Sequence, residues 1–303
     1  MRADYTETKG GPQQQISRSA RDIRHSMAER AQEAARIISI MPIMKTHRER
    51  AFGLSSQKMP ALPPKSDPTP RLSVLLASEA PVGIIFRRGP SKRVHVILWD
   101  RKHDRFKPGS WFQGRIYPDQ SDVSPDGRHL LYFAMGGVRW AIPETGGTWT
   151  AISQVPKLKA IALWGQRGGT RGGGGVFTSN RSYWIDLTPE TVCLRDDSGM
   201  RREEWSRPAS RMEREGWKKR DGGYTFEKAL PKGWILRRHS PYSSSPRHEL
   251  EQPEDGNRLA FPDWEWADWD RTRLVWAESG KVRAAQLGSH KLGTVRTLKD
   301  FGP

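Results

Sequence analysis

The pattern of hydrophobic and polar positions changes near residue 71. Beyond it, short runs rich in β-branched and aromatic residues alternate with Gly, Pro, Asp and Ser, which is typical of strands separated by turns. Strands this short, about 8–15 residues apart, favour a sandwich, barrel or propeller over helix-connected parallel sheets. The runs predicted to form strands are Val82–Phe86, Val94–Trp99, Trp111–Tyr117, His129–Ala134, Val138–Ile142, Thr148–Ile152, Ala160–Trp164, Gly175–Thr178, Tyr183–Leu187, Thr191–Arg195, Tyr224–Glu227, Trp234–Arg237, Arg258–Phe261, Arg273–Ala277, Lys281–Ala285 and Thr294–Leu298.

Residues 1–70 follow a different pattern. The first 20 residues are polar and rich in Gln, Ser and Gly, as in disordered segments. Apolar residues at intervals of three and four predict a helix from Ser26 to Ile40, which Pro42 ends. The prolines between residues 51 and 70 predict an extended linker. A start codon assigned too far upstream would also account for this segment.

These patterns predict two regions. Residues 1–70 are expected to form a disordered tail with one short helix and a proline-rich linker. Residues 71–303 are expected to form an all-β domain, with a polar insertion at about residues 196–220 as an exposed helix or loop. All 13 tryptophans lie between Trp99 and Trp276, which places the packed core in the second region because large aromatic side chains supply much of the buried area.

The charge is strongly positive. The formal net charge is +17, and residues 1–70 hold 12 Lys and Arg against 7 Asp and Glu, so 12 of the 17 net charges lie in residues 71–303. Such a charge attracts polyanions such as nucleic acid, anionic lipid or acidic proteins.

The chain holds one cysteine, Cys193, which excludes an intramolecular disulfide. We expect it to be a small buried side chain, as free cysteines often are. No secretory signal is visible, and no run approaches the length of about 18 apolar residues that a membrane-spanning helix needs. We therefore expect a cytoplasmic protein without a membrane span.

One motif has a family resemblance, the segment Ser121–Ala134 with the sequence SDVSPDGRHLLYFA. Its Ser-Pro-Asp-Gly predicts a tight turn, in which Pro presets φ and Gly supplies a permissive backbone. An alternating apolar strand follows at once. This segment resembles the TolB-like, WD-repeat-like β-propeller repeat, whose core reads S-P-D-G-x-x-L-x-[FY]. Residues 72–164 also resemble bacterial proteins of unassigned function, and both resemblances concern architecture rather than activity.

A weaker copy follows 144 residues later. Asp270–Trp276 echoes Asp126–Tyr132, and Gly280–Arg283 echoes Gly136–Arg139 at the same offset. If the segments are propeller repeats, this interval holds three or four blades of about 40–45 residues, and residues 71–303 hold about five. The resemblance therefore implies an irregular β-propeller-like domain of about five blades. The alternative is a good hairpin turn in another β fold.

Candidate chemistry is sparse. The glycine-rich run from residue 165 to 175 lacks the phosphate-loop pattern and leads into a strand, so it is expected to be a flexible loop from which Arg167 and Arg171 could contact an anion. There is no H-E-x-x-H, no paired cysteine and no G-x-S-x-G. We expect no catalytic residue, no cofactor and no metal ion.

Two clusters are candidates for anion or partner binding. The first lies in the polar insertion. Because glutamates lie nearby, the alternative is a charged, solvent-exposed segment with local ion pairs and no binding role. The second consists of Trp264 and Trp266, which strand alternation places on one face of a strand. They form either an aromatic rim for a ligand or partner, or the packing between two blades. The candidates of the two clusters are Arg201, Arg202, Arg211, Trp217, Lys218, Lys219, Arg220, Trp264 and Trp266.

Three functional hypotheses follow. The first is a non-enzymatic β-propeller-like scaffold that binds a protein partner. The second is a protein that binds nucleic acid, or another polyanion, through its basic surface. The third is a hydrolase whose site is assembled at the strand ends. The oligomeric state is not predicted.

Overall fold

The computed structural model describes residues 69–302 with short gaps, at 90–91, 137–141, 168, 171, 205–206, 221, 223, 241–245, 253–255 and 262. The chain divides into two units, residues 1–63 and 64–303, and every described residue belongs to the second. The helix predicted over residues 26–40 and most of the predicted linker lie outside the described residues. Among those that are described, no helix combines the length and the apolar character needed to cross a membrane.

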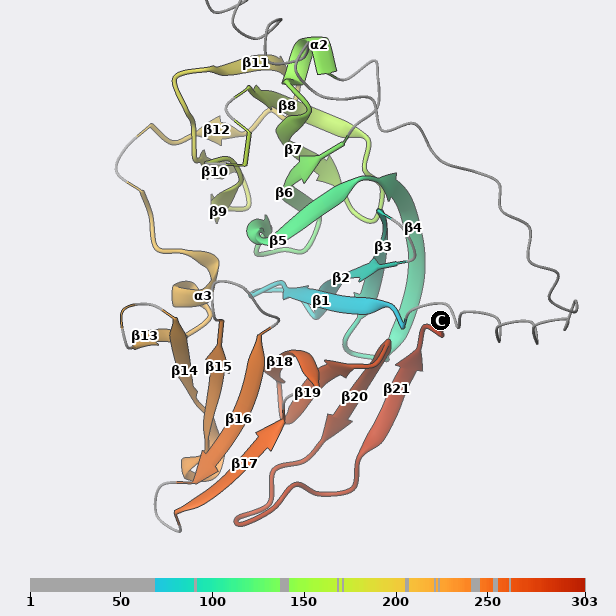
Figure 1. The fold of residues 1–303 in the computed structure, drawn as a ribbon, viewed down its shortest axis with the longest axis vertical. Helices are drawn as coiled ribbons and strands as arrows, with labels where there is room; N and C mark the ends of the chain where they lie inside the picture. The colour runs from blue at the N-terminus through green and yellow to red at the C-terminus, as the bar shows by residue number, and fades with distance from the viewer. Residues whose placement is uncertain are drawn as a thin grey trace, which may run out of the picture. The chain divides into compact units, whose positions relative to one another are not determined.

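The described part of the chain is all-β and holds five sheets, here named A to E in chain order (Figure 1). Neighbouring strands are antiparallel except for one short parallel pair in sheet C. The all-β class is thereby confirmed, and the described residues form five sheets where about five blades were expected.

The first two strands of sheet A are buried on both faces. On β1, Leu72 and Val74 enter one hydrophobic cluster and Leu75 enters another. A strand covered on both sides needs apolar residues at nearly every position, which explains the runs RLSVLL and VGIIF. The strands of sheet A, in spatial order, are β1 (Arg71–Leu76), β2 (Val82–Arg88), β3 (Arg93–Asp100) and β4 (Arg105–Gln113).

Sheet B contains the Ser-Pro-Asp-Gly motif. The motif forms the turn between the first two strands, where Gly127 has a φ of +73° and its N–H donates to the Ser124 carbonyl at 2.8 Å. Asp270–Arg273, in the echoing segment, forms the corresponding first turn of sheet E. The strands of sheet B are β5 (Arg115–Val123), β6 (His129–Met135), β7 (Thr148–Gln154), β8 (Ala160–Gln166) and β11 (Thr191–Asp196), with α2 (Ile142–Thr145) between β6 and β7.

Sheet C is the smallest. The glycine-rich run leads into its first strand through Gly172, Gly173 and Gly174, which all have positive φ between +79° and +89°. The run is therefore explained by backbone geometry, because such angles favour glycine. The strands of sheet C are β9 (Gly175–Ser179), β10 (Ser182–Ile185) and β12 (Arg201–Arg202).

Alanine at Gly174 tests this explanation. Its Cβ would lie 2.2 Å from the backbone oxygen of Gln120, in addition to the strain of the positive φ. Gly169→Ala is the matched control, because Gly169 has a φ of +75° with no atom within 4 Å of the added Cβ. We expect Gly169→Ala to lose about 1 kcal/mol of unfolding free energy and Gly174→Ala at least about 1 kcal/mol more. Equal losses in urea unfolding would show that the close approach does not exist.

Sheets D and E complete the chain. Sheet D is preceded by α3 (Arg211–Arg214), and the 3-10 turn η2 (Pro231–Gly233) connects its second and third strands. The strands of sheet D are β13 (Lys218–Arg220), β14 (Thr225–Ala229), β15 (Ile235–His239), β16 (Arg247–Gln252) and β17 (Asn257–Phe261). Those of sheet E are β18 (Trp264–Asp270), β19 (Arg273–Glu278), β20 (Lys281–Ala285) and β21 (Arg296–Asp300).

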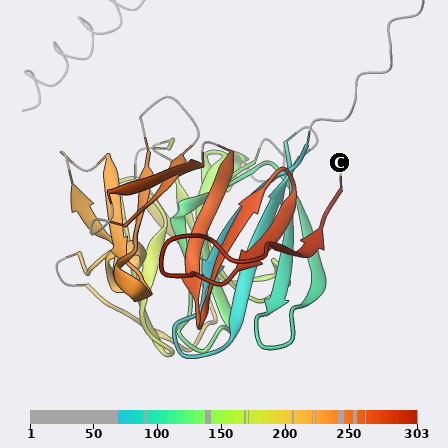
Figure 2. The same ribbon diagram turned by 90° about the horizontal axis from the view of Figure 1, so that it is seen from below.

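The five sheets are arranged as a ring (Figures 1 and 2). Four buried hydrophobic clusters join A to B, B to C, D to E, and E back to A. In the cluster between E and A, Trp99 of β3 packs with Val275 of β19 and Val282 of β20. The first and last sheets therefore close the ring. No hydrophobic cluster of the described residues joins C to D, where polar contacts of α3 bridge the sheets instead.

Two predictions about strands and burial are wrong. The strand predicted over Trp111–Tyr117 is two strands, because the backbone at Gly114 has a φ of +143° and ends β4. The strand predicted over Val138–Ile142 lies outside the described residues except for Ile142, which begins α2. Cys193 is exposed rather than buried, because β11 is the outermost strand of sheet B.

The two tryptophans of β18 do not share one face. The register of β18 against β19 shifts between them, so that Glu265 is an extra residue in the strand. Trp264 is buried between sheets D and E, where it stacks on Trp276 with ring centroids 4.7 Å apart. Trp266 packs on the other side, against the cluster between E and A. The alternation argument failed because it assumed a regular strand.

Burial of His248 couples the stability of the D–E contact to pH. Its side chain is 1 % exposed, and its Nδ1 lies 2.8 Å from the backbone oxygen of Trp264. Burial lowers the pKa of His248 from 6.5 to about 4. The unfolded chain therefore takes up a proton below pH 6.5, whereas the folded protein takes it up near pH 4. The stability contributed by the neutral ring is complete above pH 6.5, and up to about 3 kcal/mol of it is lost as the pH falls to 4.

Urea unfolding of the wild type and His248→Gln at pH 7.5, 5.5 and 4.5 checks this. The difference between the two proteins isolates His248 from the buried carboxyls, whose raised pKa values act in the opposite direction. We expect the wild type to lose more unfolding free energy than the variant between pH 7.5 and 4.5. Parallel pH profiles would contradict a buried neutral histidine.

Candidate functional site

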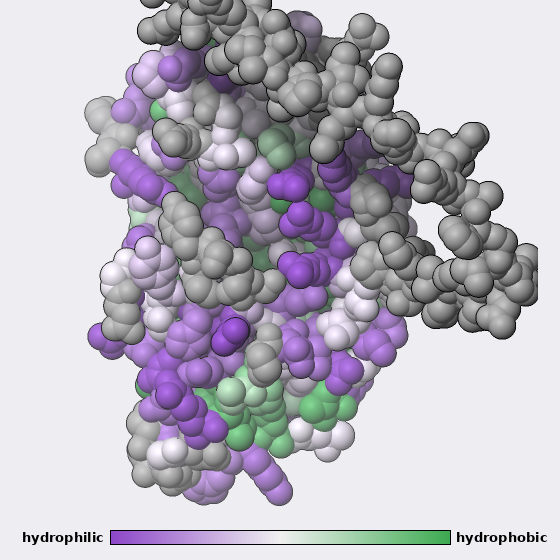
Figure 3. Space-filling model, viewed as in Figure 1, coloured by the Kyte–Doolittle hydropathy of each residue, from purple (hydrophilic) through white to green (hydrophobic). Residues whose placement is uncertain are grey.

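The candidate site is a cavity of about 520 Å³ at the centre of the ring. Its walls come from β1, β2 and β3 of sheet A, from β5, from β18, and from α3 with the residues that follow it. Figure 1 shows β1, β5, α3 and β18 meeting in the middle of the view. Hydrophilic residues gather over the middle of this face, and a hydrophobic area lies below them, over β17 and sheet E (Figure 3). The charged residues of the wall are Arg71, Arg88, Arg211, Arg238, Asp119, Glu215, Glu265 and Asp268.

Helix α3 is short but firmly defined at both ends. Ser210 caps its start, because its hydroxyl accepts from the Glu213 N–H while the Glu213 carboxylate accepts from the Ser210 N–H. Gly216, with a φ of +88°, follows its end. This fixes where Arg211 and Glu215 project, one turn apart on the side that lines the cavity.

Arg211 and Glu215 form a bidentate ion pair in the cavity wall, with Nη1 to Oε distances of 2.9 and 3.0 Å. The Arg211 side chain is 13 % exposed, and its Nε has no hydrogen-bond partner within the described residues. Burial raises the pKa of Glu215, while the charge of Arg211 acts in the opposite direction. The pair therefore offers a buried donor that is not yet satisfied.

Two further ion pairs connect the walls. Arg238 of β15 donates to both oxygens of Asp119 on β5, at 3.0 and 3.2 Å. Lys228 of β14 pairs with Asp268 of β18 at 2.5 Å, and the Trp217 indole N–H donates to the same carboxylate at 3.4 Å. The first contact joins sheets D and B, and the second joins the neighbouring sheets D and E.

Glu265 is the acid of the cavity wall that lies closest to β1. Its Oε2 accepts the Leu72 backbone N–H at 2.6 Å. Burial raises the pKa of Glu265, and the hydrogen bond from Leu72 and the charge of Arg71 act against that rise. The bulge in β18 is what brings this side chain to β1.

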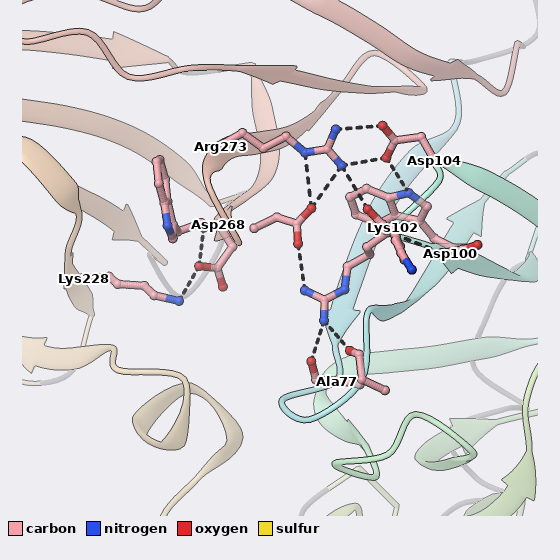
Figure 4. Close-up of polar contacts among 12 residues, drawn as sticks. Ala77, Asp100, Lys102, Asp104, Lys228, Asp268 and Arg273 are labelled. Carbon is pink, nitrogen blue, oxygen red and sulfur yellow. Dashed lines mark hydrogen bonds and ion pairs between the residues drawn. The ribbon is translucent and has the colours of Figure 1, made fainter.

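A second polar network lies between sheets A and E, next to the cavity (Figure 4). Asp270 is fully buried and accepts from Arg101 at 2.9 Å and from Arg273 at 3.1 Å. Arg273 also donates to both oxygens of Asp104, at 2.6 and 2.7 Å. These arginines satisfy the carboxylates of Asp270 and Asp104, while the buried Nε of Arg101 has no hydrogen-bond partner within the described residues. The network connects sheets A and E, and we assign it to ring closure.

The joint between C and D depends on Asp122. Its carboxylate accepts the Phe177 N–H at 2.7 Å and a hydrogen bond from Arg214, which also donates to the Phe177 carbonyl at 2.7 Å. Burial raises the pKa of Asp122, while Arg214 and Arg211 act in the opposite direction. The motif residue Asp122 thereby fixes α3, and with it one wall of the cavity.

The structure brings three of the predicted site residues to the cavity, namely Arg211, Trp217 and Trp266. Trp264 is buried elsewhere. Arg201 and Arg202 lie on β12, where each pairs with a nearby glutamate. The residues Lys218, Lys219 and Arg220 are exposed on β13, and Arg167 is exposed after β8. Arg171 lies outside the described residues. No group of three or more His, Cys, Asp or Glu in the described chain is placed to hold a metal ion.

Sequence reasoning missed most of the charged wall. The residues it missed come from four sheets and are far apart in the sequence, namely Arg71, Arg88, Asp119, Arg238 and Glu265. One available signal was the position of Glu265 between two tryptophans in a strand.

No family model matches the chain, and no curated protein matches it. Two solved structures are similar in part. TolB from Acinetobacter baumannii has a TM-score of 0.26 and 14 % identity over 75 % of this chain, which spans 56 % of the TolB chain. Hydrazine synthase from Kuenenia stuttgartiensis has a TM-score of 0.25 and 11 % identity, over 77 % of this chain and 80 % of that chain.

Proposed function

We propose that this protein is a non-enzymatic binding module whose central cavity receives a carboxylate of a protein partner. The observation that carries the proposal is Arg211, a nearly buried guanidinium in the cavity wall whose Nε lacks a partner among the described residues. A buried donor without an acceptor costs about 1–3 kcal/mol, so a carboxylate that reaches it gains that energy. A cavity of 520 Å³ accommodates a few side chains of a partner.

The charges at the wall support an anionic group rather than a cationic one. Arg88 is exposed at the cavity, whereas Asp119, Glu215 and Asp268 already have cationic partners and Glu265 accepts the Leu72 N–H. The net charge of +17 adds long-range attraction for acidic partners.

A fluorescein-labelled hexaglutamate peptide is a suitable probe, measured by anisotropy at low and physiological salt. We expect Arg88→Glu to weaken its binding by about fivefold or more, since a like charge at the rim opposes the peptide. Arg181→Glu is the matched control, because Arg181 is exposed on the β9–β10 turn, outside the cavity wall. Equal weakening by both reversals would mean that the peptide responds to net charge and not to the cavity.

Glu215→Gln separates a binding role of Arg211 from a structural one. It removes the carboxylate that competes for Arg211, and we expect the probe to bind more tightly as a result. A merely structural pair would produce no such gain. Affinity capture from the native host then identifies partners that bind wild type and Arg181→Glu but not Arg88→Glu. Capture with and without nuclease separates protein partners from nucleic acid.

The raised pKa values of Glu215 and Glu265 favour one second candidate, a hydrolase that uses a cavity carboxyl as its acid. This alternative predicts turnover of p-nitrophenyl acetate that Glu265→Gln abolishes and Glu249→Gln, on β16, leaves intact. If Glu265→Gln leaves the turnover unchanged, the hydrolase alternative is rejected.

A further inference from the structure

Trp111 is a large aromatic side chain on the outer edge of sheet A. It lies on β4, the edge strand, and is 48 % exposed. Its ring stacks on His95 of β3, with centroids 4.3 Å apart and planes 7° from parallel. Burial lowers the pKa of His95, and the nearby charge of Arg87 lowers it further, so the ring that supports Trp111 is neutral at physiological pH. The indole is thereby held in one orientation while nearly half of it stays accessible.

Two guanidinium groups lie over the ring of the same indole. The Arg93 guanidinium carbon is 5.3 Å from the ring centroid and that of Arg87 is 5.9 Å away. Arg87 is buried and anchored, since it donates to the carbonyls of Gly89 at 3.0 Å and Phe301 at 3.3 Å. Arg93 is exposed, its guanidinium lies over the Trp111 ring, and its side chain makes no hydrogen bond or ion pair within the described residues. Arg93 is therefore available to an anion next to an aromatic surface.

An amide completes the group. Gln113 lies two residues after Trp111 on β4, so the two side chains share one face of the strand. It is the cross-strand partner of Arg93, is exposed, and makes no side-chain hydrogen bond within the described chain. A fixed ring, a free guanidinium and a free amide thus lie together at one end of sheet A.

We propose that Trp111, Arg93 and Gln113 form a nucleotide-binding platform, in which a nucleobase stacks on the Trp111 indole and its phosphate pairs with Arg93. Gln113 supplies the donor and acceptor that a base edge needs. Stacking on an exposed aromatic is the usual way in which proteins hold unpaired bases, and every base presents a suitable face. Two adjacent guanidinium groups exclude a cationic ligand and favour one with phosphate. This site is separate from the central cavity and uses other residues.

The same chemistry is present in a free nucleotide and in single-stranded nucleic acid, so the test has both arms. Fluorescein-labelled dT12 and U12 are titrated by anisotropy at 50 and 200 mM salt, and AMP and UMP by calorimetry. For whichever of these ligands binds, we expect Trp111→Ala to lower the affinity by about 5- to 150-fold, which corresponds to the loss of one stacked base. If the ligand is a single strand, we expect Arg93→Ala to reduce the slope of log affinity against log salt by about 0.7.

Tyr224→Ala is the control and should leave affinity unchanged, since Tyr224 is an exposed aromatic just before β14 and no cation of the described residues lies over its ring. Far-UV circular dichroism and thermal unfolding verify that Trp111→Ala is folded, and Trp111→Phe should restore part of the affinity. Binding of the oligonucleotides alone assigns the site to single strands, and binding of AMP or UMP assigns it to nucleotides. Absence of binding in both arms, or equal binding by wild type and Trp111→Ala, overturns the proposal, whatever the hexaglutamate experiment shows.

Discussion

Replacing Asp270 by alanine is expected to destabilise the protein by about 3–5 kcal/mol, the cost of breaking a buried ion pair by removing one partner. The Asp270 side chain is fully buried and accepts from Arg101 and Arg273. Burial lowers the pKa of Arg101, which the charge of Asp270 counteracts. Without Asp270, Arg101 keeps its hydrogen bonds to the Ala77 and Ala80 carbonyls but loses its counter-ion.

Urea unfolding measures this loss directly. Asp197→Ala is the matched control, because Asp197 also pairs with an arginine, Arg195, but both side chains are more than half exposed. Such surface pairs contribute about 0–1 kcal/mol. If Asp270→Ala lost no more than Asp197→Ala, the network of Figure 4 would not connect sheets A and E.

Asp122→Ala is the second large effect, with an expected loss of about 3 kcal/mol of unfolding free energy. The substitution leaves the Phe177 N–H and Arg214 without their shared acceptor at the joint between sheets C and D. Asp122→Asn keeps an acceptor for Phe177, and because burial of Asp122 disfavours its charge, we expect a smaller loss.

Asp119→Ala is the stability control for Asp122, since Asp119 lies on the same strand but is 69 % exposed, and it should change stability by less than about 1 kcal/mol. Asp122→Ala should also weaken hexaglutamate binding, because Arg214 helps to hold α3, which carries Arg211. A stable Asp122→Ala variant with wild-type binding would show that the C–D joint does not support the cavity.

The sequence predicts strands best where burial is strongest. β2, β3, β6 and β19 are buried on both faces, and their apolar runs were recognised with ends within two residues of the structure. β16, with the sequence RHELEQ, was missed because its buried side chains are His248, Leu250 and Gln252, and two of these three are polar. Their side chains bond the backbone oxygens of Trp264 and Lys232, which lie in other elements, and such partners cannot be read from a single strand.

The site was less predictable than the fold for a different reason. The cavity wall depends on which strand of each sheet faces the centre, and this is a property of the ring and not of any one segment. Arg211 was selected because it lies in a visible basic cluster, whereas Arg88 and Glu265 lie in strands outside that cluster. Trp111 was placed in a predicted strand, but its edge position and its contact with His95 required the structure.

Closure of the ring by sheets A and E is the feature on which the cavity depends, and a double-mutant cycle between Arg101 and Asp270 measures it. The four proteins are wild type, Arg101→Gln, Asp270→Asn and the double variant, compared by urea unfolding. Direct contact between these side chains, 169 residues apart in sequence, predicts a coupling energy of about 1.5–3 kcal/mol. Additive losses, with coupling below about 0.5 kcal/mol, would place the first and last sheets apart and contradict the ring.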